Sequence, residues 1–409
     1  MITVDAGRLR ADFEQLASIG RGSDGAVQRT TFSDAHFDAR AWFAARATAA
    51  GLELRVDQAG NHSAVLAGHG GAGRSLLLGS HLDSVPAGGA YDGALGVVAA
   101  LETLRAIRDA GVTLPVTLEA IDFTDEEGEL VGLLGSWAVA GALTPEILGS
   151  PRGGRERLLA ALRRAGLTEQ GLYEARRDPD TLAGYLELHI EQGPVLERAR
   201  IDIGVVTAIA GSRSYRVVFK GARRHAGTTP IDARRDALLG AARFALAVRE
   251  TATGDFPGCV GTVGGIEVER AAFNVVPGCA RLLLELRAPD SDQLDELEAG
   301  VLAAARREAA AGALDLEVEH VGRWDPVALD ETMRSAIADA ARSLDLGTRE
   351  LISGAGHDAQ ALAAVTPAGM IFVPSVGGIS HDPDEHTRWD DCVNGANVLL
   401  TAALAVARG

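Results

Sequence analysis

Alternation between strand-like and helix-like stretches is the feature that most constrains the fold of this 409-residue chain. The expected elements before residue 209 are a helix at 34–50, strands at 62–67 and 75–80, a helix at 94–109, and strands at 114–124 and 184–190. After residue 322 the pattern resumes with helix and strand at 330–344, 358–365, 369–375 and 390–407. This order predicts an α/β domain with a mostly parallel sheet.

A segment between these two parts has a different order. Strand-like runs at 213–221, 258–269, 279–288 and 314–321 enclose helical patterns at 232–250 and 291–310. The resulting order, β-α-β-β-α-β, is the ferredoxin-like arrangement. We therefore expect a discontinuous α/β domain, residues 1–208 and 323–409, interrupted by a smaller α+β domain at 209–322.

Composition excludes several classes of partner. The chain is 47% hydrophobic, as in an ordinary globular protein. Its formal net charge of −17 argues against nucleic acid and anionic membrane surfaces as main partners. The start resembles no signal peptide, and no apolar stretch is long enough to span a bilayer, so we expect a cytoplasmic protein. Cys259, Cys279 and Cys392 are odd in number and widely spaced, which favours reduced thiols over disulfides.

Polar residues follow the apolar strands at several places. In open parallel sheets, ligands bind beyond the carboxyl ends of the strands. The nitrogen and oxygen donors at these positions are His81, Asp92, Glu127, His189 and His381. Each of them alone is explained as well by a cap or a loop hydrogen bond, but five at corresponding strand ends favour a metal such as zinc.

Two further carboxylates belong to this group. Asp83 lies two residues beyond His81, where it is expected either to fix the imidazole tautomer or to make a loop hydrogen bond. Glu126 and Glu127 are neighbours and project in different directions, so one can bind metal while the other accepts a proton from the reacting water.

A second cluster lies in the inserted segment. His225 occupies the turn-rich stretch GARRHAGTTP, Asn274 lies in AFNVVPG, and Arg287 ends an apolar strand. A guanidinium suits capture of a substrate carboxylate. The alternatives are a surface strand end for Arg287 and a simple turn residue for Asn274.

Six motifs together carry a family resemblance. They are GSHLDSVPAGGAYDGALG, DEEG, LELHIEQGPVLE, RRHAGTTPIDARRDAL, SGAGHDAQ and IFVPSVGGISHDP. In this order they resemble the M20 family of dinuclear zinc amidohydrolases, and within it the hydantoinase/carbamoylase branch. That branch holds N-carbamoyl-L-amino acid hydrolases, β-ureidopropionase-like enzymes and allantoate amidohydrolases. The likeness covers nearly the whole chain, and His189 separates it from peptidases with a glutamate there.

The resemblance implies roles for individual residues. Asp92 would bridge two divalent ions per subunit, zinc first, with manganese, cobalt or nickel as alternatives. His81 and His189 would complete one metal site, Glu127 and His381 the other, and Glu126 would be the general base. The substrate-binding residues implied are Gln192, Asn274, Arg287 and Gly356, together with His225, which would reach across a homodimer to steady the oxyanion. The larger domain would then be a zinc-aminopeptidase-like catalytic domain, and the inserted one a lid and dimerisation domain.

The expected activity is hydrolysis of the carbamoyl C–N bond of N-carbamoyl-L-amino acids or related ureido acids by a metal-bound hydroxide. Allantoate amidohydrolase and N-acyl-amino-acid amidase are alternatives within the class. A catalytically silent, metal-stabilised binding protein or a metal-free dimeric scaffold are alternatives outside it; the intact site and the crowding of its carboxylates argue against both. One departure concerns substrate choice: Asp125 replaces an asparagine common in the branch, and the shorter loop after Glu127 lacks the usual Arg-Phe pair.

Overall fold

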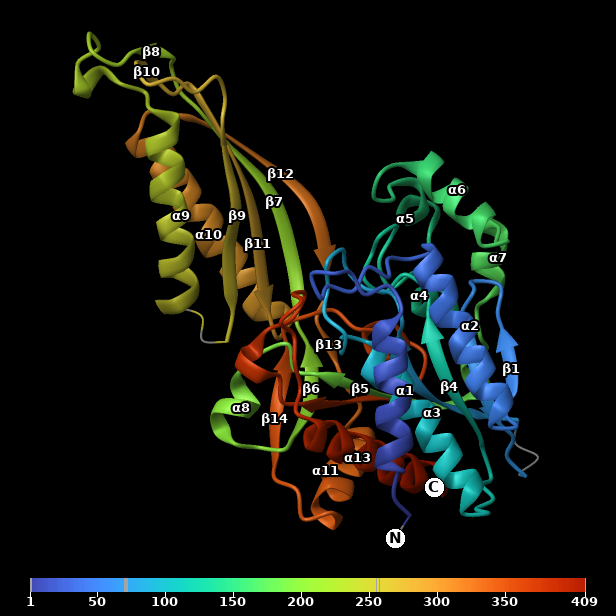
Figure 1. The fold of residues 1–409 in the computed structure, drawn as a ribbon. Coiled ribbons are helices and arrows are strands. Elements are labelled where there is room, and N and C mark those ends of the chain that lie inside the picture. Colours follow the sequence, from blue (N-terminus) through green and yellow to red (C-terminus); the bar gives the residue numbers. More distant parts are fainter. Residues whose placement is uncertain (1, 70–72, 255, 257, 409) are drawn as a thin grey trace. The chain divides into compact units, whose positions relative to one another are not determined.

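The structure is a computed structural model that describes residues 2–69, 73–254, 256 and 258–408. The chain forms two compact units (Figure 1). Unit 1 combines Met1–Thr207 with Ala328–Gly409, and unit 2 is Ala208–Val327.

Unit 1 is a mixed α/β structure around one large sheet. The strands follow the order β1-β2-β4-β3-β5-β15-β6-β13, with β14 paired to β6. Their bounds are β1 Glu53–Val56, β2 His62–Leu66, β3 Ser75–His81, β4 Thr117–Phe123, β5 Leu182–Ile190, β6 Ile203–Ile209, β13 Val327–Ala328, β14 Thr348–Ser353 and β15 Ala368–Val373. The four central strands, β4, β3, β5 and β15, run parallel, while β1, β2 and β6 pair antiparallel. The predicted mostly parallel sheet is therefore confirmed for the centre of the unit.

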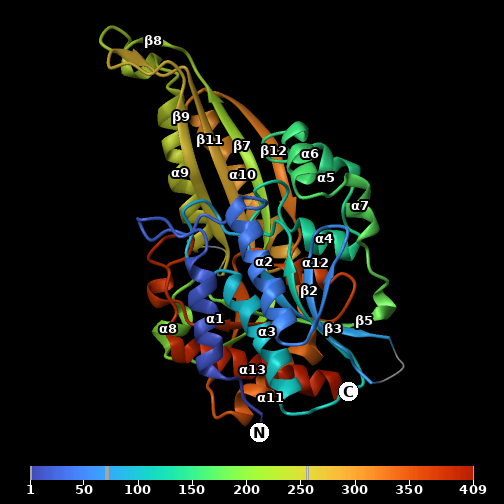
Figure 2. The same ribbon diagram turned by 45° about the vertical axis from the view of Figure 1, so that its right-hand side comes forward.

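Helices cover both faces of this sheet. The main core is shared by α1 Ala6–Ser18, α2 Asp34–Ala49, α3 Ala94–Asp109, α11 Glu331–Ser343 and α13 Trp389–Arg408. A second apolar cluster is formed by α4 Leu134–Ala140, α5 Pro145–Gly149, α6 Arg155–Arg164 and α7 Glu169–Glu174. Two short helices, α8 Val195–Ala199 and α12 Asp358–Leu362, follow β5 and β14. Figure 2 shows α1 and α3 side by side, and both helices contact α13.

The central strands are buried because both faces of the sheet are covered. All seven residues of β3 and all six of β15 are buried. Such strands read as continuous apolar runs rather than as alternating ones. Buried polar residues also occur within these strands, as Glu119 of β4 and Glu187 of β5 show, but the imidazoles of His81 and His189 stand at or next to the carboxyl ends.

Unit 2 is an antiparallel sheet with two helices. Its main elements are β7 Gly211–Lys220, α9 Ala237–Gly254, β9 Val260–Val268, β11 Cys279–Ala288, α10 Ser291–Ala311 and β12 Asp315–Trp324. The strand order is β12-β7-β11-β9, and α9 and α10 pack beside each other against the sheet (Figure 1). A small ribbon of β8 Arg224–His225 and β10 Val275–Val276 lies beyond the end of the sheet where β11 begins.

Several elements differ from the sequence prediction. The helix expected from residue 232 starts at Ala237, because Pro230 and the 3₁₀ turn Ile231–Ala233 precede it. The helices α1 and α4 to α8 were not expected, and most of the latter are short and lack a clear 3.6-residue apolar period. No helix among the described residues has the length and apolar character needed to cross a membrane.

Candidate metal centre

The carboxyl ends of the central strands bring five of the predicted donors together. His81 is the last residue of β3, and His189 is the next-to-last residue of β5. Glu127 follows β4 and His381 follows β15, while Asp92 precedes α3. Parallel strands end at the same edge of a sheet, so residues far apart in sequence meet there.

Asp92 lies between two groups of donors. Its Oδ1 is 3.0 Å from Nε2 of His189 and 3.5 Å from Nε2 of His81. Its Oδ2 is 3.2 Å from Nε2 of His381, which is in turn 3.6 Å from Oε2 of Glu127. Two candidate metal-holding triads, His81–Asp92–His189 and Asp92–Glu127–His381, thus share Asp92.

The two buried imidazoles are held in one orientation by backbone carbonyls. Nδ1 of His81 is 3.0 Å from the carbonyl oxygen of Asp83, and Nδ1 of His189 is 2.9 Å from that of Ile190. When Nδ1 donates to a carbonyl, the lone pair of the neutral ring is on Nε2. Both Nε2 atoms face Asp92, which is the arrangement that metal coordination requires.

Asp83 supports the centre in a way that differs in detail from the expectation. The nearest approach of its carboxylate to His81 is 3.8 Å, so the short contact to the imidazole comes from its backbone. The carboxylate instead accepts hydrogen bonds from Thr31 Oγ1 at 2.9 Å and from the amides of Glu126 and Glu127, both at 3.3 Å. Asp83 therefore orients the loop that carries the two glutamates.

Glu126 lies on the His81 side of the centre. Its Oε2 is 3.4 Å from Nε2 of His81, and its side chain is 10% exposed. Glu127 lies on the opposite side, beside His381, and its Oε1 accepts a hydrogen bond from the amide of Val85 at 3.3 Å. The neighbouring glutamates thus reach different members of the cluster, as their directions in sequence predict.

Two residues that the sequence analysis missed tie the loops of the centre together. Glu385 is buried and accepts hydrogen bonds from the amides of Tyr91 at 2.8 Å and Asp92 at 3.1 Å. Ser380 Oγ lies 3.1 Å from a carboxylate oxygen of Asp92 and 2.9 Å from one of Glu385, and its single hydroxyl proton can be shared between them. A Cβ on Gly89 would overlap the Glu385 side chain, which explains the glycine there. Ser380 and Glu385 lie close to His381 in the stretch SHDPDE, and this proximity in sequence is the signal that could have identified them.

A third group of candidate ligands, Glu187, His189 and His357, lies behind the centre. Two of its members already have hydrogen-bond partners. Glu187 accepts from Ser80 Oγ at 2.8 Å and from the amide of Ala359 at 3.0 Å, and Nε2 of His357 is 2.8 Å from Ser353 Oγ. The rings of His357 and His189 pack edge to face, with their centroids 4.6 Å apart. We interpret this group as packing that fixes His189.

The pKa values of the cluster are shifted because several carboxylates and imidazoles are buried close together. Burial, with Asp92 as the next cause, raises the pKa of Glu127 to about 8. Burial also raises the pKa of Glu126 well above its usual range. The hydrogen bond to Asp92 raises the pKa of His381 to about 9. Burial acts to raise the pKa of Asp92, but the surrounding imidazoles, His189 first, hold it well below its usual range.

The donor set therefore fits divalent metal ions. Three buried or nearly buried carboxylates crowd together with three imidazoles whose Nε2 atoms converge on Asp92. Crowded carboxylates are unfavourable unless protons or cations neutralise them. Imidazole nitrogen and carboxylate oxygen are the ligands that zinc and related metals take.

The remaining predicted site residues divide between the two units. Gln192 belongs to unit 1, and its Nε2 donates to Oδ2 of Asp92 at 2.7 Å. Gly356 is in the exposed loop between β14 and α12 of the same unit. In unit 2, His225 pairs with Val275 across β8 and β10, next to Asn274. Arg287, by contrast, lies near the other end of β11, where its Nε donates to Glu285 at 2.7 Å.

A parallel α/β sheet whose strand ends assemble these imidazoles and carboxylates is the framework of a metal-dependent hydrolase. The chain belongs to Peptidase family M20/M25/M40, whose sequence profile matches residues 77–405. Within this family it is an amidohydrolase by its curated relatives.

Two curated relatives and one solved structure illustrate the similarity. The N-carbamoyl-L-amino acid amidohydrolase of Geobacillus stearothermophilus is 36% identical over 406 residues, covering 98% of each chain. The allantoate amidohydrolase of Bacillus subtilis is 33% identical over 379 residues, covering 91% of each. The crystal structure of an amidase of the hydantoinase/carbamoylase family from Burkholderia multivorans matches with a TM-score of 0.91 and 36% identity, covering 100% of this chain and 99% of that one.

Proposed function

We propose that this amidohydrolase cleaves the carbamoyl C–N bond of N-carbamoyl-L-amino acids or related ureido acids with one water molecule, releasing the free amino acid and carbamate, which decomposes to ammonia and carbon dioxide. The observation that carries the proposal is the position of Asp92 between two sets of ligands: its Oδ1 lies beside His189 and its Oδ2 beside His381. The names of the relatives support the substrate class.

We assign the two triads to two divalent ions. His81 and His189 would hold one ion, Glu127 and His381 the other, and Asp92 both. Zinc is the first candidate, with manganese, cobalt and nickel as alternatives, because these metals share such ligands. When bound, the ions polarise the substrate carbonyl and acidify the attacking water.

Glu126 is assigned as the general base. It reaches the His81 side of the cluster but belongs to neither triad, so its carboxylate is left for proton transfer. In this role it takes a proton from the attacking water and delivers it to the leaving nitrogen. Its burial favours the protonated form, which suits the second half of that task.

The substrate residues of unit 2 point to a homodimer. Arg287 lies eight residues along β11 from Cys279, or roughly 26 Å at the usual rise of a strand. His225 and Asn274 lie beyond the Cys279 end. A substrate of amino-acid size cannot touch both ends of this strand, so we infer that the two sets of residues come from different subunits if all three act on one molecule. Asn274 would thus join His225 in the partner's site.

Unit 2 is therefore proposed as a ferredoxin-like lid and dimerisation domain, close to residues 209–322. Its β9 is an edge strand, and Val260 on it is 53% exposed. On the neighbouring helix α9, Leu239 and Leu246 are 49% and 64% exposed. An open edge and apolar helix residues are features that a second copy would cover. The cytoplasmic location expected from the sequence remains a prediction.

The test is ammonia release from metal-stripped protein reloaded with zinc or manganese. The substrates are N-carbamoyl-L-amino acids, N-carbamoyl-β-alanine, allantoate and an N-acetyl-amino acid. Metal-dependent release from a carbamoyl amino acid supports the proposal, whereas turnover of allantoate alone favours the activity named for the Bacillus subtilis relative. Hydrolysis of the N-acetyl compound alone would contradict it, and the altered loop after Glu127 would then be the first place to look.

A further inference from the structure

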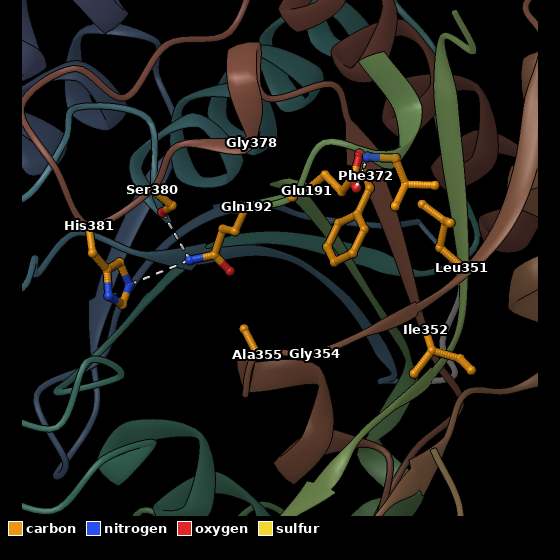
Figure 3. A pocket seen from close by; sticks show the side chains of 12 residues that line it. Glu191, Gln192, Leu351, Ile352, Gly354, Ala355, Phe372, Gly378, Ser380 and His381 are labelled. Carbon is orange, nitrogen blue, oxygen red and sulfur yellow. Dashed lines mark hydrogen bonds between the residues drawn. The ribbon is translucent and has the colours of Figure 1, made fainter. Parts of the chain in front are cut away.

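A cavity of about 430 Å³ opens beside the metal centre, within unit 1 (Figure 3). Its polar side is formed by Gln192, Ser380 and His381. Its opposite side is lined by the apolar residues Val195, Leu351, Ile352, Ala355 and Phe372. Because His381 and Gln192 also contact Asp92, the cavity is continuous with the donor cluster.

The amide of Gln192 has a fixed orientation at the boundary between cluster and cavity. Its Nε2 donates to Oδ2 of Asp92 at 2.7 Å and lies 3.2 Å from Ser380 Oγ. A carboxylate oxygen can only accept, so the amide cannot be flipped. Its Oε1 therefore points into the space between Ala355 and Phe372, as Figure 3 shows. This oxygen is buried and has no hydrogen-bond partner among the described residues, so it is free to accept an N–H donor from a ligand.

The cavity beyond this oxygen selects against charge. None of the described residues that line it is a lysine or an arginine. Its one carboxylate, Glu191, is occupied by the amides of Val195 at 2.7 Å and Leu196 at 2.8 Å. An anionic group in the apolar part of the cavity, beside Val195, Leu351 and Phe372, would lose its hydration without gaining a hydrogen-bond donor from these side chains, which is unfavourable. An apolar group would bury its surface against Leu351 and Phe372.

We propose that this cavity receives the side chain of the substrate's amino acid, that it favours apolar side chains from about leucine to phenylalanine in size, and that Gln192 Oε1 accepts the N–H beside the scissile bond. The inference rests on the proposed function and refines it. It places N-carbamoyl derivatives of leucine, methionine and phenylalanine above those of glycine, aspartate and β-alanine, and above allantoate. Glycine and β-alanine derivatives leave the cavity empty, and the aspartate derivative brings a charge into it.

The first measurement is kcat/KM for the N-carbamoyl derivatives of L-leucine, glycine and L-aspartate with the zinc-loaded enzyme. We expect the leucine derivative to exceed the glycine derivative by about 10- to 100-fold, the range that burial of one such side chain supplies. Equal values for leucine and glycine, or a preference for aspartate, would overturn the inference. Silence on every carbamoyl compound would instead overturn the proposed function itself.

Two variants test the walls directly. The side chain of Ala355 points into the cavity (Figure 3), so Ala355→Leu should lower kcat/KM for the leucine derivative at least tenfold and leave the glycine derivative within about twofold. Leu351→Ala enlarges the cavity and should shift preference from leucine towards phenylalanine. Thr348→Leu is the matched control, because Thr348 is an exposed residue on the same strand as Leu351. It should leave the ratio of kcat/KM between the leucine and glycine derivatives, and that between leucine and phenylalanine, unchanged. Equal losses on the glycine and leucine derivatives in both cavity variants would contradict the assignment.

Discussion

Glu385 accepts a hydrogen bond from the backbone amide of Asp92 at 3.1 Å, and so holds the residue that both candidate metal triads share. The same carboxylate oxygen binds the amide of Tyr91, and the other receives the hydroxyl of Ser380, next to His381. One buried side chain therefore connects the loop of the shared ligand to the loop of His381.

Replacing Glu385 should weaken metal binding at the His381 side before the His189 side. In Glu385→Ala we expect about a 10- to 100-fold loss of affinity for one of two ions, the usual cost of removing a group that orients ligands. Metal analysis at increasing chelator concentration would then show a state with one ion per subunit. A matched control is Asp384→Ala, whose side chain is exposed nearby. Release of both ions from this variant at the same chelator concentration would contradict the role.

Glu126→Gln should remove turnover while leaving the metals in place. The substitution keeps the size of the side chain but removes proton transfer, so we expect kcat to fall by about 100- to 10,000-fold. Metal content by elemental analysis should stay near that of the unmodified protein, because Glu126 is in neither triad. Glu127→Gln is the comparison, since it should lose metal as well as activity. Retained turnover in Glu126→Gln would remove it from the mechanism.

Mixing two inactive variants tests whether His225 acts in the partner's site. His225→Ala and Glu126→Gln should each be inactive as homodimers. After subunits exchange, half of the dimers are mixed and each mixed dimer has one complete site, so activity should return to about a quarter of the unmodified level. Recovery should require exchange, followed by mass spectrometry of differently tagged subunits. No recovery after complete exchange would mean that both residues act in one subunit, and an active His225→Ala homodimer would mean that His225 is not needed.

The stability of metal-free protein should fall as pH rises from 6 to 9. The native pKa of Glu127, raised to about 8, and that of His381, raised to about 9, exceed the values of these groups in an unfolded chain. The native state then binds more protons than the unfolded state in this window, so stability is lost as pH passes through the native values. Asp92, whose pKa is lowered, is ionised in both states there and does not oppose the trend.

Bound metal should reverse this dependence. Ligands must lose their protons to bind, so metal affinity should increase from pH 6 to 9 and loading should release protons. Thermal melting of stripped and zinc-loaded protein at both pH values tests the first point, and calorimetry in two buffers of different ionisation enthalpy tests the second. A melting temperature of the stripped protein that rises from pH 6 to pH 9 would contradict the predicted loss of stability.

The residues of the centre were predictable because strand ends are visible in sequence. The apolar run of β3 stops at His81, and the run of β5 closes with His189 and Ile190. Glu385 was not predictable in the same way. It lies beside a turn with no apolar strand immediately before it, and its partners, the amides of Tyr91 and Asp92, are more than 290 residues away.

The sequence by itself determined the alternation of elements, the parallel centre of the sheet and the identity of the strand-end donors, because apolar periodicity and residue chemistry are local properties. Only the tertiary structure decided which oxygen of Asp92 faces which imidazole, that Asp83 approaches His81 through its carbonyl, and that Gln192 leaves an unpaired oxygen over an apolar cavity. These relationships depend on angles between side chains from strands and loops far apart in the chain. Packing of the whole unit fixes such angles, and no local pattern encodes them.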